Sequence, residues 1–361
     1  MARIAFLIPN LAGGGAERVA LTLVGALADR GHEVDLLVME AVGELAGQVP
    51  AGVKLVDLHV KRTRKVLWPL IRYLRKRRPD ALQVSMWPLT TVGILATRLA
   101  RSGTRCVVSD HAVLSDHYAR SKHAFLGASV RLFYPLANAR VGVSSGAVED
   151  LARLARLDPS MFTVIANPIS FPRKLQRRAD VEAMWGDCQS RILTVGQLKP
   201  EKDQALLIRA VARLPQSLGA KLMIVGEGNL RDELLALARQ EGVEDRLILP
   251  GYAADVWPFY ASADLFTLSS REESFANVLV EALYAGLPIV STATIGAASV
   301  LDDGKWGRIV PKGDVEALAT ALAEQLSRKP DAAERRARAL ELSGCASIDR
   351  YEELLLGGAS G

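Results

Sequence analysis

Cysteine is scarce in this sequence of 361 residues. The three cysteines, Cys106, Cys188 and Cys345, are far apart, and no C-x-x-C pair occurs. This spacing provides neither the cysteine and histidine clusters of a structural zinc site nor a disulfide framework. We therefore predict a protein of a reducing compartment whose fold depends on side-chain packing.

Long apolar runs are also missing. Because no stretch of about 18 uninterrupted apolar residues occurs, we predict no transmembrane helix. The apolar run in MARIAFLIPN is too short for the core of a signal peptide, and acidic Glu17 follows soon after it. The expected location is the cytoplasm.

Acidic residues are absent from residues 61–78, KRTRKVLWPLIRYLRKRR, which contain nine lysines and arginines. The net charge of the chain is only +5, so the rest of the chain is net acidic and the positive charge is local. Anionic lipid or a phosphate-bearing substrate would bind such a patch, and Trp68 and Tyr73 beside the cations suit a membrane interface. Pro69 is expected to interrupt a single long helix here. A solvated helix face explains the charges equally well, and both interpretations stay open at this point.

Strand and helix patterns alternate along the chain, whose length suits two domains of roughly 150–190 residues each. Arg3–Ile8 is a nearly continuous apolar run, which predicts a strand buried on both faces, and the helical spacing of 16–30 ends before Gly31. The same pattern starts again at 191–195. Such alternation predicts doubly wound parallel sheets, so the fold class is α/β with two Rossmann-like domains. The remaining strands are expected at 34–39, 53–58, 82–86, 105–109, 140–143, 221–225, 246–249, 264–268 and 288–291.

The two domains are predicted at residues 1–172 and 191–346, followed by a C-terminal helical segment at 347–361. Residues 173–190 are the predicted linker, because prolines and a basic cluster gather around their start. Ligands of open parallel sheets bind at the carboxyl ends of the strands. We therefore expect the domains to face each other across a cleft that loops of both halves line.

A glycine-rich loop follows the first predicted strand. Residues 11–18 contain Gly13, Gly14 and Gly15 in front of a helix, where backbone amides approach an anion closely. The loop matches neither the dinucleotide-binding G-x-G-x-x-G nor the phosphate-binding G-x-x-x-x-G-K-[ST]. A tight turn without a ligand remains an alternative.

Three strand-end loops of the second half fall on one predicted sheet edge. Gly196 ends a strand and Lys202 follows at a helix start, where its ammonium group would lie near a diphosphate. Gly226 and Tyr252 belong to the next two loops. Glycines are common in any turn, so it is the agreement of the loops on one edge that favours a phosphate site.

Two acids, Glu273 and Glu281, flank the apolar run of EESFANVLVEAL. With this motif the chain resembles the retaining glycosyltransferases of family 4, which have the GT-B fold and use nucleotide-sugar donors. The two acids match the family's E-x7-E motif, and the resemblance covers nearly the whole chain. The other matching stretches are GGGAERVALTLVGALADRGHEV, VIANPI, VGQLKPEKD and VGEGNLRDEL.

The resemblance implies a role for each residue of the donor motif. Glu273 would lie beside the donor sugar, Glu281 would bind the nucleotide ribose, and Lys202 would neutralise the diphosphate. Backbone amides at the helix start would stabilise the same diphosphate, since unsatisfied N–H groups and the helix dipole favour an anion. These amides belong to Phe275, Ala276, Asn277 and Val278.

Two departures from the family pattern affect the same site. Gln197 stands where the family usually has arginine, and glutamine donates hydrogen bonds without neutralising charge. Ser274 and Ala276 replace the glycines of the usual E-G-F-G, which places two small side chains near the sugar.

The resemblance also assigns roles in the first half. Gly14 and Gly15 would flank the donor phosphates, and His111 would contact substrate, although a packing histidine is an alternative. Residues 347–361 would cross back to the first domain.

We therefore predict a retaining glycosyltransferase that moves a sugar from a nucleotide-sugar donor, with UDP-sugars favoured, to an acceptor hydroxyl. The resemblance favours a polyprenyl-diphosphate-linked saccharide acceptor in bacterial surface polysaccharide or lipopolysaccharide assembly, bound by the first domain at the inner face of the plasma membrane. No enzymic nucleophile is evident, and the resemblance implies a leaving-group-assisted route in which the leaving phosphate accepts the acceptor proton. No cofactor and no nucleic-acid partner are expected, and no metal, because D-x-D is absent and cationic groups replace the ion. The catalytic residues would be Glu273, His111 and Lys202.

Two other functions compete with this prediction. A nicotinamide-dependent dehydrogenase would use the glycine-rich loop and Glu40, at the end of the second strand, but it leaves the second half unexplained. A non-catalytic nucleotide-sugar-binding protein would tolerate a damaged donor motif, whereas both glutamates and Lys202 are present.

Overall fold

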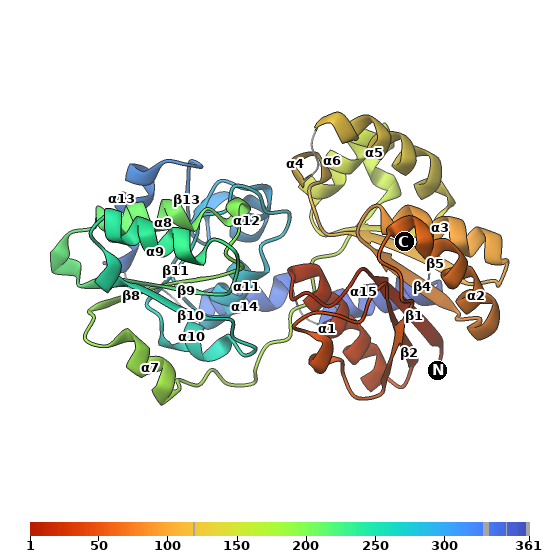
Figure 1. Ribbon diagram of the computed structural model, residues 1–361, viewed down its shortest axis with the longest axis horizontal. Coiled ribbons are helices and arrows are strands. Elements are labelled where there is room, and N and C mark those ends of the chain that lie inside the picture. Colours follow the sequence, from red (N-terminus) through yellow and green to blue (C-terminus); the bar gives the residue numbers. More distant parts are fainter. Residues whose placement is uncertain (118–119, 328–331, 344, 359–361) are drawn as a thin grey trace. The chain divides into compact units, whose positions relative to one another are not determined.

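The computed structural model describes residues 1–117, 120–327, 332–343 and 345–358. They form two compact units, the first built from Met1–Ser170 and Ser343–Gly361 and the second from Phe171–Leu342. Each unit contains one parallel sheet with helices packed on it, so the predicted α/β class with two parallel-sheet domains is confirmed (Figure 1). Within the described ranges no helix combines the length and the apolar character needed to cross a bilayer.

The first unit has a seven-stranded sheet in the order β3-β2-β1-β4-β5-β6-β7. All of its strand pairs are parallel, so every strand ends at the same edge of the sheet. Its strands are β1 (Arg3–Ile8), β2 (Glu33–Val38), β3 (Val53–Asp57), β4 (Ala81–Ser85), β5 (Arg105–Asp110), β6 (Ala139–Gly142) and β7 (Thr163–Val164). Its helices are α1 (Gly15–Asp29), α2 (Leu67–Arg77), α3 (Leu89–Ala100), α4 (Leu114–His117), α5 (Arg120–Phe133), α6 (Ser145–Ala155) and α15 (Cys345–Leu356).

The second unit has a six-stranded parallel sheet in the order β10-β9-β8-β11-β12-β13. From β8 the chain runs outward to β9 and β10 and then returns to β11 on the other side of β8. Its strands are β8 (Ser190–Val195), β9 (Ala220–Val225), β10 (Leu247–Gly251), β11 (Leu265–Leu268), β12 (Ile289–Thr292) and β13 (Arg308–Val310). Its helices are α7 (Ala179–Trp185), α8 (Gln204–Ala212), α9 (Arg231–Gln240), α10 (Trp257–Ser262), α11 (Asn277–Ala285), α12 (Ile295–Leu301), α13 (Val315–Leu326) and α14 (Ala332–Leu342).

Strand β1 explains why the buried runs are apolar without interruption. Ala5 and Leu7 pack into the core on one face of the sheet, whereas Ile4, Phe6 and Ile8 pack into the core on the other face. Successive side chains of a strand point to opposite faces, so a central strand covered by helices on both faces has no solvent-facing position.

Two strands and one helix were not predicted from the sequence. β7 and β13 are two and three residues long, which is too short for a recognisable apolar run. The predicted linker 173–190 contains α7, which buries Val181 and Trp185 completely, and the Trp185 indole donates to Ser262 Oγ at 2.9 Å. α7 therefore packs as part of the second unit.

The expectation that Pro69 interrupts a helix is wrong. α2 begins at Leu67, so Pro69 lies in its first turn, where the missing N–H group would have no helical acceptor. The helix continues from there to Arg77.

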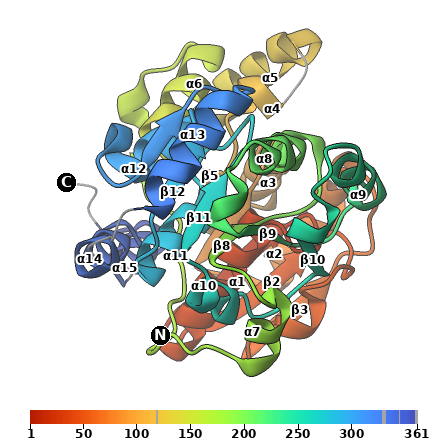
Figure 2. The same ribbon diagram turned by 90° about the vertical axis from the view of Figure 1, so that its left-hand side faces the viewer.

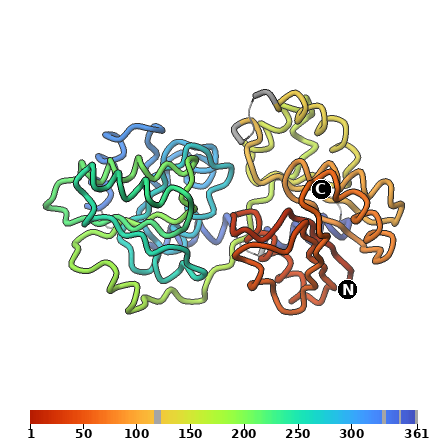
Figure 3. The backbone as a smooth tube through the Cα atoms, viewed as in Figure 1, coloured from red at the N-terminus to blue at the C-terminus, as the bar shows by residue number. Residues whose placement is uncertain are grey.

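The C-terminal helix α15 packs in the core of the first unit, and Figure 3 shows this blue segment among the red and orange segments. Tyr351 is fully buried there. Two polar contacts also hold the helix: Arg30 forms an ion pair with Asp349 at 2.5 Å, and His32 Nε2 lies 2.8 Å from Glu352 Oε1.

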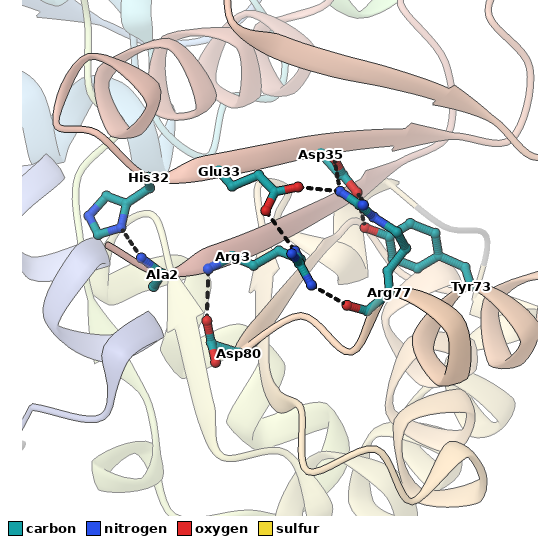
Figure 4. A network of polar contacts seen from close by, with 8 residues as sticks. All are labelled: Ala2, Arg3, His32, Glu33, Asp35, Tyr73, Arg77 and Asp80. Atoms are coloured by element: carbon teal, nitrogen blue, oxygen red, sulfur yellow. Dashed lines mark hydrogen bonds and ion pairs between the residues drawn. The ribbon is translucent and has the colours of Figure 1, made fainter.

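A polar network attaches the last turn of α2 to the sheet of the first unit (Figure 4). Its centre is Asp35 on β2, whose side chain is only 1% exposed. Asp35 accepts hydrogen bonds from Tyr73 Oη at 2.6 Å and from Arg77 Nε at 3.1 Å. Glu33 pairs with Arg77 at 2.5 Å and with Arg3 at 2.8 Å. One cation of the basic stretch 61–78 is therefore a structural ion-pair partner.

We expect Arg77→Ala to lower the free energy of unfolding by about 3 kcal/mol, because it leaves the buried Asp35 carboxylate without its cation. Arg72→Ala is the matched control, since Arg72 is exposed on the same helix, and it should cost at most about 0.5 kcal/mol. Calorimetric melting of both variants measures the difference. Equal losses would show that the Asp35 pair contributes nothing specific.

Candidate functional site

Most of the predicted site residues lie after two neighbouring strands of the second sheet, from which the chain continues in opposite directions along the sheet. β8 and β11 are neighbours, and their following loops leave toward opposite sides of the sheet; Figure 2 shows β9, β8 and β11 side by side. Open parallel sheets bind ligands at such a switch point. The loop after β8 runs to Lys202, and the loop after β11 contains Glu273.

Lys202 and Glu273 form an ion pair that joins these two loops. Lys202 Nζ lies 2.5 Å from Glu273 Oε1, and the Ser270 hydroxyl donates to the same oxygen at 2.7 Å. The Glu273 side chain is 12% exposed and that of Lys202 28%, so the pair is stronger than one in open solvent. The Ser269 hydroxyl also donates to the Lys202 carbonyl at 2.8 Å. An ammonium group has three N–H donors, so its bond to Glu273 leaves it able to bind an anion.

Helix α11 begins four residues after Glu273 and carries Glu281. Ala276 at its N-cap has no polar side chain, so the protein supplies no cap to the first-turn amides from this position. Such amides and the helix dipole together attract a negative group. Of the amides predicted to face phosphate, that of Asn277 donates to the Phe275 carbonyl at 3.1 Å.

Gly296 on α12 fixes the backbone between Glu273 and α11. Its amide donates to the Glu273 carbonyl at 2.7 Å. A β-carbon at Gly296 would lie 3.0 Å from the amide nitrogens of Phe275 and Ala276, which is tighter than most real contacts. Only a glycine therefore lets α12 approach this loop without displacing it.

The glycine loops of the second unit interlock along the same edge. Gly226 has a φ of +150°, and a β-carbon there would lie 2.0 Å from the Gly196 carbonyl oxygen. The Gly226 amide donates to the carbonyl of Gly251, which precedes the half-buried Tyr252. The structure thus brings Gly196, Gly226 and Tyr252 to the strand ends.

Gln197 is half-buried in the first of these loops. Its backbone carbonyl oxygen accepts a hydrogen bond from Gln204 Nε2 at 2.9 Å, which connects the loop to the start of α8. Ser274 is half-buried next to Glu273, whereas Phe275 and Ala276 are buried.

Gly14, Gly15 and His111 belong to the first unit. In its glycine loop, Gly13 is the residue with a positive φ, of +87°, and Gly14 is the N-cap of α1. A β-carbon on Gly14 would lie 2.4 Å from Glu17 Oε2, so a carboxylate lies against the loop. A phosphate at this helix terminus would experience repulsion until Glu17 moved.

His111 follows β5 and has a protein partner at each ring nitrogen. Nδ1 lies 3.2 Å from Asn167 Oδ1, and Nε2 lies 3.1 Å from Ser109 Oγ. An amide oxygen only accepts, so Nδ1 carries the proton and Nε2 accepts from the Ser109 hydroxyl. Part of the residue reaches the surface, yet burial of the ring lowers the pKa of His111 to about 4. This is the environment of a packing histidine; a substrate contact through either nitrogen requires one of these bonds to open.

The pKa of His111 predicts sensitivity to acid. The unfolded chain gains a proton near the ordinary pKa of 6.5, whereas the folded state resists protonation down to about 4. The buried neutral imidazole therefore costs no stability above about pH 6.5, and the free energy of unfolding falls by about 2.5 kcal/mol as the pH is lowered to about 4.5. Glutamine does not titrate, so His111→Gln should remove this part of the decrease.

The control for this measurement is His59→Gln, because the His59 side chain is 83% exposed. Chemical denaturation at several pH values should give His59→Gln the pH profile of the unaltered protein. A profile of His111→Gln that parallels both would contradict burial of a neutral imidazole.

Three residues of the site were not predicted from the sequence. Ser270 lies three residues before Glu273 and is fully buried against it. Gly296 gave no signal beyond being a glycine, and Tyr260, whose hydroxyl lies 2.7 Å from Glu281 Oε2, lies on a different helix. In the described part of the chain, no three His, Cys, Asp or Glu side chains gather as a metal site would require.

Two family models match the chain. The model described as Glycosyltransferase Family 4 matches residues 13–171, and the model described as Glycosyl transferases group 1 matches residues 185–341. Together they cover most of both units.

Two curated relatives are similar over nearly their whole length. The chain is 29% identical over 325 residues to N-acetylgalactosamine-N,N'-diacetylbacillosaminyl-diphospho-undecaprenol 4-alpha-N-acetylgalactosaminyltransferase of Campylobacter jejuni, covering 86% of each chain. It is 28% identical over 368 residues to the lipopolysaccharide core biosynthesis glycosyltransferase LpsE of Rhizobium meliloti, covering 95% of this chain and 96% of LpsE.

Solved structures share the fold. The structure of Anabaena Alr3699/HepE in complex with UDP and glucose matches with a TM-score of 0.82 at 20% identity, over 99% of this chain and all of the other. WaaG, a glycosyltransferase involved in lipopolysaccharide biosynthesis, matches with a TM-score of 0.75 at 21% identity, over 98% of this chain and all of WaaG. The predicted GT-B fold is thereby confirmed.

Proposed function

Because the chain belongs to the glycosyltransferase family that these two models describe, we propose that it is a retaining enzyme that transfers a sugar from a nucleotide-sugar donor to an acceptor hydroxyl. The observation that carries this proposal is the Lys202–Glu273–Ser270 cluster at the switch point of the second sheet. It combines a cation for a diphosphate with a carboxylate for sugar hydroxyls. Glu281, on the adjacent helix α11, supplies a second carboxylate for the ribose.

In the proposed reaction the bond between the anomeric carbon and the leaving phosphate oxygen breaks as the acceptor oxygen bonds to the same carbon. The acceptor proton passes to the leaving phosphate, so no enzymic base is consumed. Lys202 and the first-turn amides of α11 stabilise the negative charge that develops on the diphosphate. Attack from the face of the leaving group retains the configuration of the anomeric carbon.

We propose UDP-sugars as donors and lipid-linked saccharides as acceptors. The donor proposal is supported by Anabaena Alr3699/HepE, whose structure contains UDP and glucose. The acceptor proposal is supported by the Campylobacter relative, whose name specifies a saccharide on diphospho-undecaprenol, and by LpsE, whose name specifies lipopolysaccharide core biosynthesis. Bacterial surface polysaccharide assembly at the inner face of the plasma membrane is the corresponding setting.

A thermal-shift screen with UDP-, GDP-, ADP- and dTDP-sugars tests the donor, because a ligand that binds only the folded state raises its melting temperature. We expect UDP-sugars to give the largest shift. Lys202→Met should weaken binding at least about tenfold, which is about 1.4 kcal/mol, since the diphosphate loses its cation. Lys199→Met is the matched control, because Lys199 is an exposed lysine of the same loop.

Equal binding by both lysine variants would contradict the phosphate role of Lys202. Binding of a donor without transfer to any acceptor would favour the non-catalytic alternative. We also expect transfer to persist in a chelator; activity that is lost with EDTA and restored by manganese would contradict the metal-free mechanism.

We further propose that the first unit binds an anionic membrane through the exposed face of α2. Trp68, Arg72 and Lys76 are spaced by four residues and so lie on one side of this helix. The Trp68 residue is 72% exposed, an unusual position for a large apolar side chain. With Tyr73 and neighbours the three residues line an open groove of about 490 Å³. An exposed tryptophan beside cations suits the interface of a bilayer.

Liposome flotation tests this surface. Replacing four exposed cations by glutamine should reduce binding to phosphatidylglycerol vesicles at least about tenfold, because each cation near an anionic surface contributes about 1 kcal/mol. Arg77 is left intact, so the Asp35 ion pair keeps α2 in place. The four replaced residues are Arg62, Lys65, Arg72 and Lys76.

A control variant with the same change in net charge distinguishes this surface from general attraction. It replaces four exposed cations outside 61–78 and should bind like the unaltered protein. Equal flotation of the two variants would remove the membrane proposal. The control residues are Arg173, Lys174, Arg308 and Lys312.

A further inference from the structure

Tyr260 on α10 contacts the Glu281 carboxylate of the proposed donor site from the core of the second unit. Its hydroxyl lies 2.7 Å from Glu281 Oε2 and 3.3 Å from the Val278 carbonyl oxygen. The residue is only 1% exposed, whereas Glu281 keeps part of its surface accessible. Glu281 is therefore accessible from the solvent side while Tyr260 contacts it from the core.

The proton of this hydroxyl belongs to the bond with Glu281. A phenol has a single O–H group, and of its two acceptors the carboxylate oxygen is both closer and charged. Hydrogen bonds to a charged group are shorter and about twice as strong as bonds between neutral groups. The Val278 carbonyl lies one helical turn before Glu281, so the hydroxyl is held against a single turn of α11.

The ring of Tyr260 is fixed by other aromatic side chains. It stacks on Phe266 of β11, with the ring centroids 5.5 Å apart and the planes 30° apart. The ring of Trp257 also lies against it, with the centroids 5.7 Å apart. Rings packed on a strand of the sheet leave the phenol oxygen little freedom. The hydroxyl is therefore a fixed point in the structure.

A tyrosine at a buried position requires a reason. Phenylalanine fills nearly the same volume, and burying a hydroxyl costs free energy unless it forms a hydrogen bond. Here the hydroxyl is directed at the one carboxylate of α11. A flexible glutamate that is held before the ligand arrives loses less conformational freedom on binding.

We propose that Tyr260 is a positioning residue, whose hydroxyl holds the Glu281 carboxylate in the orientation that binds the ribose diol of the nucleotide. This inference rests on the proposed donor role of Glu281. It adds a residue from a different helix, with no motif of its own, to the determinants of nucleotide affinity.

The test is titration calorimetry of the full-length protein with UDP, with GDP and ADP run in parallel. Tyr260→Phe should raise the dissociation constant about tenfold, because Glu281 loses a charge-assisted hydrogen bond that orients it. Tyr284→Phe is the matched control. Tyr284 belongs to the same aromatic cluster, but its hydroxyl donates to the Pro172 carbonyl at 2.5 Å, and affinity should change less than about twofold.

Two further measurements separate positioning from general loss of packing. In a Glu281→Gln background, Tyr260→Phe should have a much smaller effect, because the carboxylate that it orients is gone. With 2′,3′-dideoxy-UDP, which lacks the diol, the unaltered protein and Tyr260→Phe should bind equally. Both variants should keep the calorimetric melting transition of a folded protein.

Each outcome decides between the two proposals. If the unaltered protein binds none of the three nucleotides, the donor proposal fails and this inference fails with it. If UDP binds the unaltered protein and Tyr260→Phe equally, the donor proposal stands and the positioning role is overturned. A loss of affinity that is the same for UDP and 2′,3′-dideoxy-UDP would also overturn it, because the ribose contact would not be the one affected.

Discussion

A parallel sheet brings the carboxyl ends of all its strands to one edge, and the candidate site depends on this constraint. In the second unit β8 and β11 are neighbours although about 70 residues of sequence separate their ends, because the chain fills one side of β8 before it returns to the other. Lys202 and Glu273 consequently lie 2.5 Å apart. The ion pair is only partly exposed, and it joins the loop after β8 to the loop after β11.

Sequence patterns predicted the strands whose apolar residues follow one another directly in the chain. The strands of five or six residues were placed within one or two positions, since a strand covered on both faces must be apolar throughout. β7 and β13 are too short to carry such a signal. The E-x7-E motif gave both acids, because a motif records spacing along the chain. The motif could not predict Tyr260, whose hydroxyl contacts Glu281 because α10 packs beside α11 in the folded unit.

The surroundings of individual side chains could not be predicted from the sequence either. Three glycines before a helix resemble an anion site, yet Glu17 lies against Gly14 in the folded unit. His111 follows a strand as a substrate contact would, yet Ser109 and Asn167 lie at its two nitrogens. Within the basic stretch 61–78, the helical period places the cations of α2 on different sides of the helix. Arg77 turns toward Asp35, while Arg72 and Lys76 stay exposed beside Trp68.

The two acids of α11 and its preceding loop have different partners, and this difference matches the different chemistry proposed for them. Glu273 faces an ammonium group, so the pair carries no net charge and an anionic diphosphate can approach without strong repulsion. Glu281 accepts from a neutral phenol, which orients the carboxylate. A carboxylate held in a fixed orientation can accept hydrogen bonds from the neutral hydroxyls of a ribose. In the proposed site, Glu273 is thus paired with the cation that also meets the diphosphate, whereas Glu281 is oriented by a phenol toward the ribose hydroxyls.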